Sequence, residues 1–350
     1  MDWLEVDRQI KEGLIVRQKH PTADLTIYNY TARAAYERVW TPESMACRGL
    51  IADSTGRIRA RPFPKFHNLD EHLAMGGTIP DEPFEVYEKL DGSLGILYWL
   101  VEGSKYVPHL ATRGSFTSEQ ARRGGAILRE RYGHLYFSTH LTYLFEIIYP
   151  ENRIVVNYGD KADIVLLTVI ETQSGHERPD IVDILAKDGL PVVTRHEGIA
   201  AVDQLRAMDE RNREGYVIRF ASGLRLKVKM AEYVRLHRLL TGVTSRVIWE
   251  YLKDKRDLGE ILDRVPDEFN QWVRDTIDRL RLNYEEVESY CRSVFKDLGD
   301  RKATAAYFQT CGHRSVLFLM LDGKDYSDAI WKAIKPGAER AFYQVREETA

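Results

Sequence analysis

The sequence predicts an α+β protein in which antiparallel sheets flanked by helices are followed by an all-α C-terminal domain. Up to residue 230, short β-rich runs alternate with turn residues, and helical segments are fewer. Beyond that point apolar residues recur at helical spacing, as at Trp272, Val273, Ile277 and Leu280. We therefore expect one domain over residues 1–237 and a helical domain over residues 238–350.

The strands of the first domain are expected where alternating apolar residues are bounded by turn residues. These runs are DLTIYNY (24–30), GLIADSTGRIRARPF (49–63), EVYEKLDGSLGILYWLV (85–101), LTYLFEIIY (141–149), IVLLTVIE (164–171), EGYVIRF (214–220) and LRLKVKM (224–230). Their number and shortness favour antiparallel sheets over a single parallel one.

Composition and charge narrow the class of protein. A chain of 350 residues that is 44% hydrophobic can bury a large core and suits two domains. Its most apolar runs are far shorter than a membrane span, and its first residues lack a secretory pattern, so we expect a cytoplasmic protein without membrane association. Three widely spaced cysteines exclude a disulfide scaffold. A net charge of −3 means that any polyanion must be held by a local groove.

Lys89, in the run EKLDGS, places a cation in an apolar strand. A primary amine becomes a nucleophile only when it loses its proton, and burial and nearby cations are the usual ways to lower its pKa. The run LRLKVKM supplies cations, because Lys227 and Lys229 are two residues apart and share one strand face. Leu226 and Val228 then point to the other face. The alternative is an exposed strand with two solvated lysines.

Two carboxylates stand where burial would be costly without partners. Glu146 interrupts the apolar run YLFEIIY, and Glu214 opens the strand EGYVIRF. Ion pairs with Arg or Lys would satisfy both carboxylates. A metal–nucleotide site would satisfy them equally, because Mg²⁺ prefers oxygen ligands and accompanies polyphosphate. Arg113, in ATRGSF, is a cation beside a glycine turn, which is a common loop on its own.

The order of these runs is more specific than any one of them. The sequence reads Arg48-Gly49, EKLDGS, TRGSF, FEIIYPENRIVVNY, EGYVIR and LKVK. It thereby resembles the covalent nucleotidyltransferases, which comprise RNA and DNA ligases and messenger RNA capping enzymes. Within them it most resembles the bacteriophage RNA ligase 1 family, because IYNYT, ACRGLI, RPFPKFHN and PENRIVV also stand where that family has them. The resemblance covers residues 14–237.

This resemblance implies an ATP-dependent RNA ligase and a nucleotidyltransferase domain over residues 1–237. Lys89 would attack the α-phosphate of ATP, expel pyrophosphate and become joined to AMP. The AMP would then pass to an RNA 5′-phosphate, from which a 3′-hydroxyl displaces it. Asp91 would shape the turn that presents the lysine and would help the sealing step. Lys227 and Lys229 would hold phosphates and stabilise charge on phosphorus.

The resemblance also implies a nucleotide site and a metal site. Mg²⁺ or Mn²⁺ would be held by Glu214 and Glu146, with Glu146 on the ribose or metal side of the nucleotide. Leu167 and Val217 would sandwich the adenine, although each is equally explained as a core strand residue. The residues implied to bind the cofactor are Arg48, Lys65, Glu88, Gly92, Arg113, Glu146, Leu167, Glu214 and Val217.

Two departures from the family pattern bear on these expectations. The family often has lysine where this sequence has Arg113, so a planar fork replaces a compact ammonium and its contact is open. Nothing after residue 237 resembles the five-stranded barrel of DNA ligases and capping enzymes, which favours an RNA ligase. The alternatives are a capping-type or DNA-joining nucleotidyltransferase, and a non-catalytic RNA-binding protein on the same scaffold.

The implied partner is RNA with 5′-phosphate and 3′-hydroxyl ends. A cleaved transfer RNA is one candidate, and a separate end-healing kinase-phosphatase would prepare such ends. Residues 231–350 contain 20 basic and 21 acidic residues, a balance that argues against a nonspecific phosphate clamp. We expect the helical domain to help recognise a folded RNA. The alternative is that its helices only cover an apolar face of the first domain.

Overall fold

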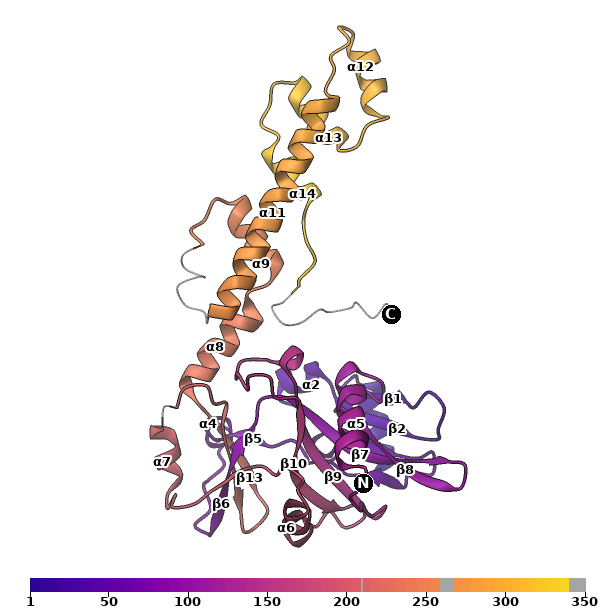
Figure 1. The fold of residues 1–350 in the computed structure, drawn as a ribbon, viewed down its shortest axis with the longest axis vertical. Helices are drawn as coiled ribbons and strands as arrows, with labels where there is room; N and C mark the ends of the chain where they lie inside the picture. The colour runs from indigo at the N-terminus through magenta and orange to yellow at the C-terminus, as the bar shows by residue number, and fades with distance from the viewer. Residues whose placement is uncertain (209, 259–266, 340–350) are drawn as a thin grey trace. The chain divides into compact units, whose positions relative to one another are not determined.

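The computed structural model describes residues 1–208, 210–258 and 267–339. It divides into two compact units, Met1–Val234 and Arg235–Ala350. The first unit contains three sheets with helices against them, and the described part of the second is built from helices (Figure 1). The predicted α+β class, with antiparallel sheets followed by C-terminal helices, is therefore confirmed.

The first sheet is antiparallel throughout, in the order β1-β2-β3-β4. Its strands are β1 (Ile15–Lys19), β2 (Thr26–Tyr30), β3 (Arg48–Ala52) and β4 (Ile58–Ala60). Helix α1 (Trp3–Lys11) packs on it, because Val6 shares one buried cluster with Ile15 and Leu50. The short helices α2 (Ala32–Glu37) and α3 (Pro42–Ala46) connect β2 to β3.

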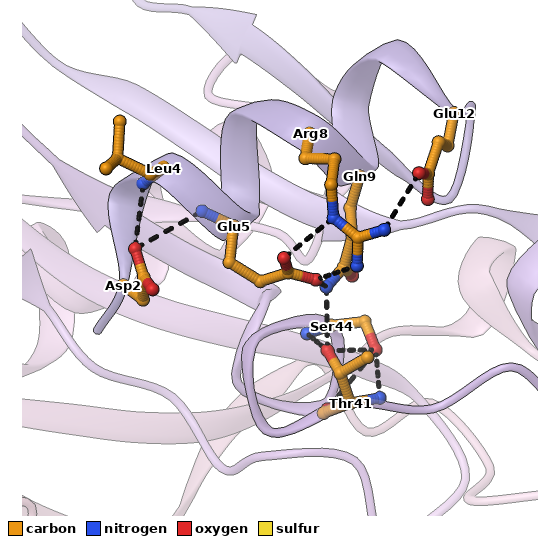
Figure 2. A network of polar contacts seen from close by, with 8 residues as sticks. All are labelled: Asp2, Leu4, Glu5, Arg8, Gln9, Glu12, Thr41 and Ser44. Atoms are coloured by element: carbon orange, nitrogen blue, oxygen red, sulfur yellow. Dashed lines mark hydrogen bonds and ion pairs between the residues drawn. The ribbon is translucent and has the colours of Figure 1, made fainter.

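Polar side chains fasten α1 to the start of α3 (Figure 2). Gln9 is fully buried and donates its Nε2–H to Thr41 Oγ at 2.8 Å. Thr41 and Ser44 form a reciprocal capping box at the first turn of α3, and a cap of this kind contributes about 1 kcal/mol. The chain immediately after Trp40 is therefore held in place from two sides.

The second sheet is also antiparallel, in the order β10-β9-β7-β8. Its strands are β7 (Ser93–Glu102), β8 (Lys105–Ala111), β9 (Leu141–Ile148) and β10 (Asp163–Glu171). Helices α5 (Glu119–Tyr132) and α6 (Pro179–Lys187) pack on one face (Figure 1). Leu128 of α5 joins Leu97, Phe145 and Leu166 of the strands in one buried cluster. A 3₁₀ turn, η1 (Pro150–Asn152), follows β9.

The third sheet has the order β11-β6-β12-β13-β5. Its strands are β5 (His67–Asn68), β6 (Phe84–Lys89), β11 (Arg195–His196), β12 (Gly215–Phe220) and β13 (Arg225–Lys229). β13 pairs with β5 in parallel, unlike the other strand pairs of this sheet. One face is a buried core that includes Tyr216, Ile218 and Leu226. Helices α4 (Leu69–Ala74) and α7 (Val202–Ala207) follow β5 and β11.

The helices of the C-terminal part are α8 (Ala231–Gly242), α9 (Ser245–Lys253), α11 (Asp267–Val294), α12 (Arg301–Phe308), α13 (Arg314–Leu321) and α14 (Ser327–Ala333). Val273, Ile277 and Leu280 of α11 are buried, as their helical spacing predicts. Cys291 and Phe308 are fully buried in a second cluster with residues of α13 and α14. Across the described residues, every helix is too short or too polar to cross a bilayer.

Candidate active site

The ends of three neighbouring strands bring two lysines to one carboxylate. β12 lies between β6 and β13, so Gly215 is paired with Lys89 on one side and with Lys229 on the other. Glu214 immediately precedes Gly215. Its carboxylate oxygens lie 2.7 Å from Lys89 Nζ and 3.0 Å from Lys229 Nζ. Three residues that the sequence places in separate runs therefore form one ion-paired cluster.

Gly215 makes this close approach possible. Its φ is +148°, and a Cβ added to it would lie 2.0 Å from the carbonyl oxygen of Val228 and 2.8 Å from the Cα of Lys229. Any side chain would therefore force β12 and β13 apart at the level of Glu214. The sequence run EGYVIR contains this glycine, but nothing in its spacing indicated the requirement.

The Glu214 side chain is only 4% exposed, so its charge depends on the two lysines. Burial alone would raise the pKa of this carboxyl, but Lys89 and Lys229 outweigh burial and hold that pKa below its ordinary value. Removing one partner of such a buried pair usually costs about 3–5 kcal/mol, because the remaining charge is left uncompensated. The cluster is therefore a fixed element of the site.

Lys227 lies on the same strand face as Lys229 but has no carboxylate beside it. Among the described residues, none forms an ion pair with it, and its ammonium lies 5.2 Å from the centre of the Phe66 ring. Burial, reinforced by the positive charges of Lys89, Lys65 and Arg48, lowers the pKa of Lys227 to about 7. An anion bound here would stabilise the ammonium form.

Two arginines farther along the same sheet show the contrast. Arg225 lies 2.5 Å from Glu177, and Arg219 lies 3.0 Å from Glu85 and 3.4 Å from Glu177. Their charges are thus neutralised within the fold. Lys227, by contrast, has no ion-pair partner among the described residues and is available to an external anion.

Arg48 and Lys65 approach this end of the sheet from the first sheet and from the loop after β4. Arg48 Nη1 is buried and donates no hydrogen bond within the described part of the chain, and the guanidinium lies 5.8 Å from the Phe66 ring centre. Burial lowers the pKa of Lys65, although Glu71 lies 3.8 Å away. Phe66 therefore lies near both Arg48 and Lys227. The buried donor of Arg48 lacks a hydrogen-bond partner among the described residues, and a phosphate oxygen could supply one.

Glu146, on β9, is the second carboxylate of the site. Burial raises the pKa of Glu146 to about 8; Lys89 opposes this shift, whereas Glu214 and Asp91 reinforce it. Within the described ranges no group of three or more His, Cys, Asp and Glu residues is arranged to hold a metal ion. One or two carboxylates are enough when the metal also binds phosphates. The donor set thus suits a metal that arrives with a nucleotide.

Asp91 is buried, and its carboxylate accepts hydrogen bonds from two backbone amides and one tyrosine hydroxyl. Its Oδ2 accepts hydrogen bonds from the amides of Val155 and Val156 at 2.8 and 2.9 Å, and Oδ1 accepts from the Tyr233 hydroxyl at 2.8 Å. The Asp91 amide donates to Tyr158 Oη at 2.8 Å. Asp91 therefore ties the turn after Lys89 to the segment that follows η1 and to the first turn of α8.

Two neighbours of Lys89 differ in how they face the site. A Cβ on Gly92 would lie 2.6 Å from the Ile147 carbonyl oxygen and 3.1 Å from Glu146 Cγ, so glycine is required beside β9. Glu88 alternates with Lys89 along β6 and is paired with the buried Tyr216. Its side chain thus lies on the strand face opposite Lys89.

Leu167 and Val217 are partly exposed, unlike most of their neighbours in β10 and β12. Leu167 lies in a β-bulge, since β10 skips one residue between Leu166 and Thr168 in its register with β9. A bulge redirects the side chain it carries. Val217 shares its strand face with Lys89 across the sheet, because it is paired with Tyr87. Both residues present apolar surface that the core does not fully cover.

Arg113 is exposed and contacts the first sheet. Its Nη1 donates to Tyr30 Oη at 3.2 Å, and its guanidinium lies 5.2 Å from the centre of that ring. Gly49 lies beneath it, with φ +93° and a hypothetical Cβ 3.1 Å from Arg113 Cα. The planar group therefore stacks on tyrosine, a contact that a compact ammonium would make less well.

Sequence reasoning missed several residues that organise the site. Tyr233 donates to Asp91 and places its ring 5.0 Å from Lys229 Nζ, and Tyr158 accepts from the Asp91 amide. Phe66 contacts both Arg48 and Lys227. An aromatic residue beside a lysine run was the only local signal for them, and aromatic residues are common in strands.

Comparisons with known proteins identify the family of the chain. The family model described as RNA ligase, of the phage T4 RNA ligase 1 type, matches residues 46–233. An RNA ligase of Rhodothermus phage RM378 is 23% identical over 92% of this chain and 86% of its own length. A protein of Autographa californica nuclear polyhedrosis virus, whose name couples a polynucleotide kinase with an RNA ligase, is 29% identical over 43% of this chain and 25% of its own length. A solved archaeal ATP-dependent RNA ligase has a TM-score of 0.46 at 15% identity, covering 91% of this chain and 87% of that one.

The fold, the lysine–carboxylate cluster and the matched region together define a ligase. The chain belongs to the RNA ligase family of the phage T4 RNA ligase 1 type. The matched range, residues 46–233, spans the lysine–carboxylate cluster.

Proposed function

We propose that the protein joins 5′-phosphate and 3′-hydroxyl ends of RNA in an ATP-dependent reaction that passes through lysine–AMP and RNA–adenylate intermediates. One observation carries this proposal: Lys89 and Lys229 share the buried carboxylate of Glu214, beside Lys227, which has no counter-ion among the described residues. An amine at a cation-rich strand end suits nucleophilic attack on a polyphosphate.

The proposed reaction consists of three successive displacements at phosphorus. The Lys89 amine, having lost a proton, forms a P–N bond to the α-phosphate while the bond to the β-phosphate oxygen breaks and pyrophosphate leaves. An oxygen of the RNA 5′-phosphate then displaces the lysine and takes the AMP. Finally the 3′-hydroxyl of the second end attacks that 5′-phosphorus, loses its proton and expels AMP. Each step needs charge stabilisation rather than redox chemistry.

Glu214 sets a condition on the first displacement. Lys89 Nζ lies 2.7 Å from Glu214, so Lys89 must break this ion pair before it can attack the α-phosphate. Lys229, 3.0 Å from the other oxygen, keeps the carboxylate in place when Lys89 moves. Lys227, whose pKa burial lowers to about 7, gains its proton when a phosphate arrives and then neutralises that phosphate.

Glu214 and Glu146 are the residues that would hold Mg²⁺ or Mn²⁺ together with the nucleotide phosphates. A bound divalent cation neutralises phosphate charge and orients the leaving group. Leu167 and Val217 offer apolar surface to an adenine ring, and Arg48 and Lys65 offer cations to the phosphates. Asp91 serves by keeping the turn that carries Lys89 in register with the segment after η1.

Incubation with α-labelled ATP and Mg²⁺, followed by 5′-phosphorylated RNA, tests the proposal. We expect a labelled protein, transfer of the label to the RNA 5′ end, and then joined RNA. Labelling by GTP instead of ATP would indicate a capping-type enzyme, and sealing of nicked duplex DNA would indicate a DNA-joining one. Tight RNA binding with no label from either nucleotide would establish the non-catalytic alternative.

We further propose that residues 238–350 help recognise a folded RNA such as a cleaved transfer RNA, while residues 1–237 carry the nucleotide chemistry. Every residue assigned to that chemistry lies in the unit Met1–Val234. The viral protein named for both a kinase and an RNA ligase supports a link to an end-healing enzyme, which would supply the 5′-phosphate.

Shortening the chain to end near Leu240 should leave labelling of the protein by ATP intact, because all assigned catalytic groups remain. The preference for a structured, broken-loop RNA over an unstructured strand should disappear. Labelling and joining of both RNAs are compared for the full and shortened proteins, with thermal melting as the control for folding. A folded, shortened protein that keeps its RNA preference would show that the C-terminal helices only cover an apolar face.

A further inference from the structure

A hollow of about 370 Å³ lies on the second sheet, away from the candidate active site. It is formed by β7, β8, the end of α5 and the loop that follows α5. The side chains that matter for its chemistry are Trp99, Tyr106, Arg129, Tyr136 and Phe137. None of them takes part in the nucleotide chemistry proposed above.

The aromatic rings of this hollow are unusually open to solvent. Tyr136 is 83% exposed and Tyr106 is 63% exposed, whereas Phe137 is buried beneath them. Trp99 is partly exposed, and its Nε1–H is buried without a hydrogen-bond partner in the described part of the chain. Exposed flat rings beside an unused donor suit a ligand that stacks and also carries acceptor atoms.

The charge of the lining selects among such ligands. Arg129 is the charged residue of the lining, which contains no carboxylate, and no ion pair joins it to another described residue. Aromatic rings that accept a flat base, combined with an unpaired arginine, are the elements that proteins use to hold single-stranded nucleic acid. An apolar peptide would use the rings but neither the arginine nor the indole donor.

The position of the hollow fixes which part of an RNA could reach it. Trp99 is six residues from Ser93 along β7, which is about 20 Å at about 3.3 Å per residue. The hollow lies on the face of the sheet that packs against α5, which carries Leu97, Phe145 and Ile147. Glu146 points to the opposite face, because side chains alternate along β9. A base in the hollow therefore belongs to the strand about six or more stacked nucleotides from the joined ends, at about 3.4 Å per nucleotide.

We propose that this hollow binds a nucleobase of the RNA substrate at a distance from the joined ends, with the base stacked on Tyr136 and Tyr106 and its phosphate near Arg129. The inference rests on the proposed RNA-joining function and adds a second contact for the same strand. The contact tolerates any base, because stacking uses the ring face common to all four.

The test measures the affinity of the full-length protein for fluorescent RNA without ATP. We expect Tyr136→Ala, Tyr106→Ala and Arg129→Gln each to weaken binding of an RNA of about twenty nucleotides about fivefold or more. Tyr136→Phe should keep the wild-type affinity because it keeps the ring. Ile184→Ala, a change at an exposed apolar residue of α6 outside the hollow, is the matched control.

Three results would overturn the proposal. The first is unchanged affinity of Tyr136→Ala and Tyr106→Ala for this RNA. The second is an equal loss in Ile184→Ala, which would indicate a general effect. The third is a self-associated protein that Tyr136→Ala dissociates without weakening RNA binding, which would make the hollow a protein interface. Failure of ATP to label the wild-type protein would instead count against the proposed function, because RNA affinity is measured without ATP.

Discussion

Replacing Lys89 by alanine should abolish covalent labelling by α-labelled ATP and all ATP-dependent joining, because it removes the amine proposed to form the P–N bond. Lys89→Arg should fail as well, since a guanidinium does not deprotonate at working pH. The label is followed on denaturing gels and assigned to a residue by mass spectrometry. Joining of RNA that is already adenylated should survive better than labelling, because that step does not need the lysine nucleophile.

The Lys89→Ala result needs one control for labelling and one for folding. Lys105→Ala removes an exposed lysine from the start of β8 and should leave labelling unchanged. Thermal melting of Lys89→Ala checks the fold, because the change removes one of the two lysines that form ion pairs with the buried Glu214. Lys227, whose pKa is lowered to about 7, is the rival nucleophile by charge alone. A label that persists in Lys89→Ala, or that maps to Lys227 in the wild-type protein, would show that the assignment is wrong.

Replacing Lys227 or Lys229 by alanine should slow lysine adenylylation by about 10²-fold or more, as loss of a preorganised charge contact often does. The two variants should differ in cause. Lys227→Ala removes a proposed phosphate contact, whereas Lys229→Ala removes one of the two lysines paired with Glu214 and so strengthens the ion pair that Lys89 must break. Single-turnover labelling rates at saturating ATP measure both.

The residues between these lysines provide the matched comparison. Leu226 and Val228 are 1% and 7% exposed on the opposite strand face. Truncating a buried leucine to alanine costs about 2–5 kcal/mol, so Leu226→Ala should lower the melting temperature while folded molecules keep their labelling rate. Equal loss of activity per folded molecule at all four positions would contradict the alternation of the two faces.

The local spacing of apolar residues predicted many of the strands and helices. The alternation in LRLKVKM correctly separates a buried face from a charged one, and the apolar spacing of residues 273–280 correctly predicts a helix. The sequence pattern did not predict β1, because four of its five residues are exposed and it has no apolar alternation. β8 was also missed, because Pro108 and polar residues obscure its pattern. The parallel pairing of β13 with β5 leaves no local trace, since register between distant strands is not written in either strand alone.

The candidate site was likewise predicted only in part from the sequence. The order of runs along the sequence singled out Lys89, Glu146, Glu214 and the lysines of β13 as chemistry-bearing residues, and the RNA ligase family match is consistent with that order. It could not say which groups neutralise one another. Lys89 was expected to be a desolvated amine among cations, yet the structure pairs it with Glu214, and the amine that burial and cations affect most is Lys227.

The sequence by itself determined which side chains share a face, because the two-residue repeat of a strand and the 3.6-residue repeat of a helix are properties of the local backbone. It also determined that several cations and carboxylates had to meet a partner. Only the tertiary structure decided the partners: β12 lies between β6 and β13, and Gly215 lets the strands close on Glu214. Charge and burial act through space, so the pairing of Glu214 with two lysines from different strands follows from sheet order and register, which no local pattern encodes.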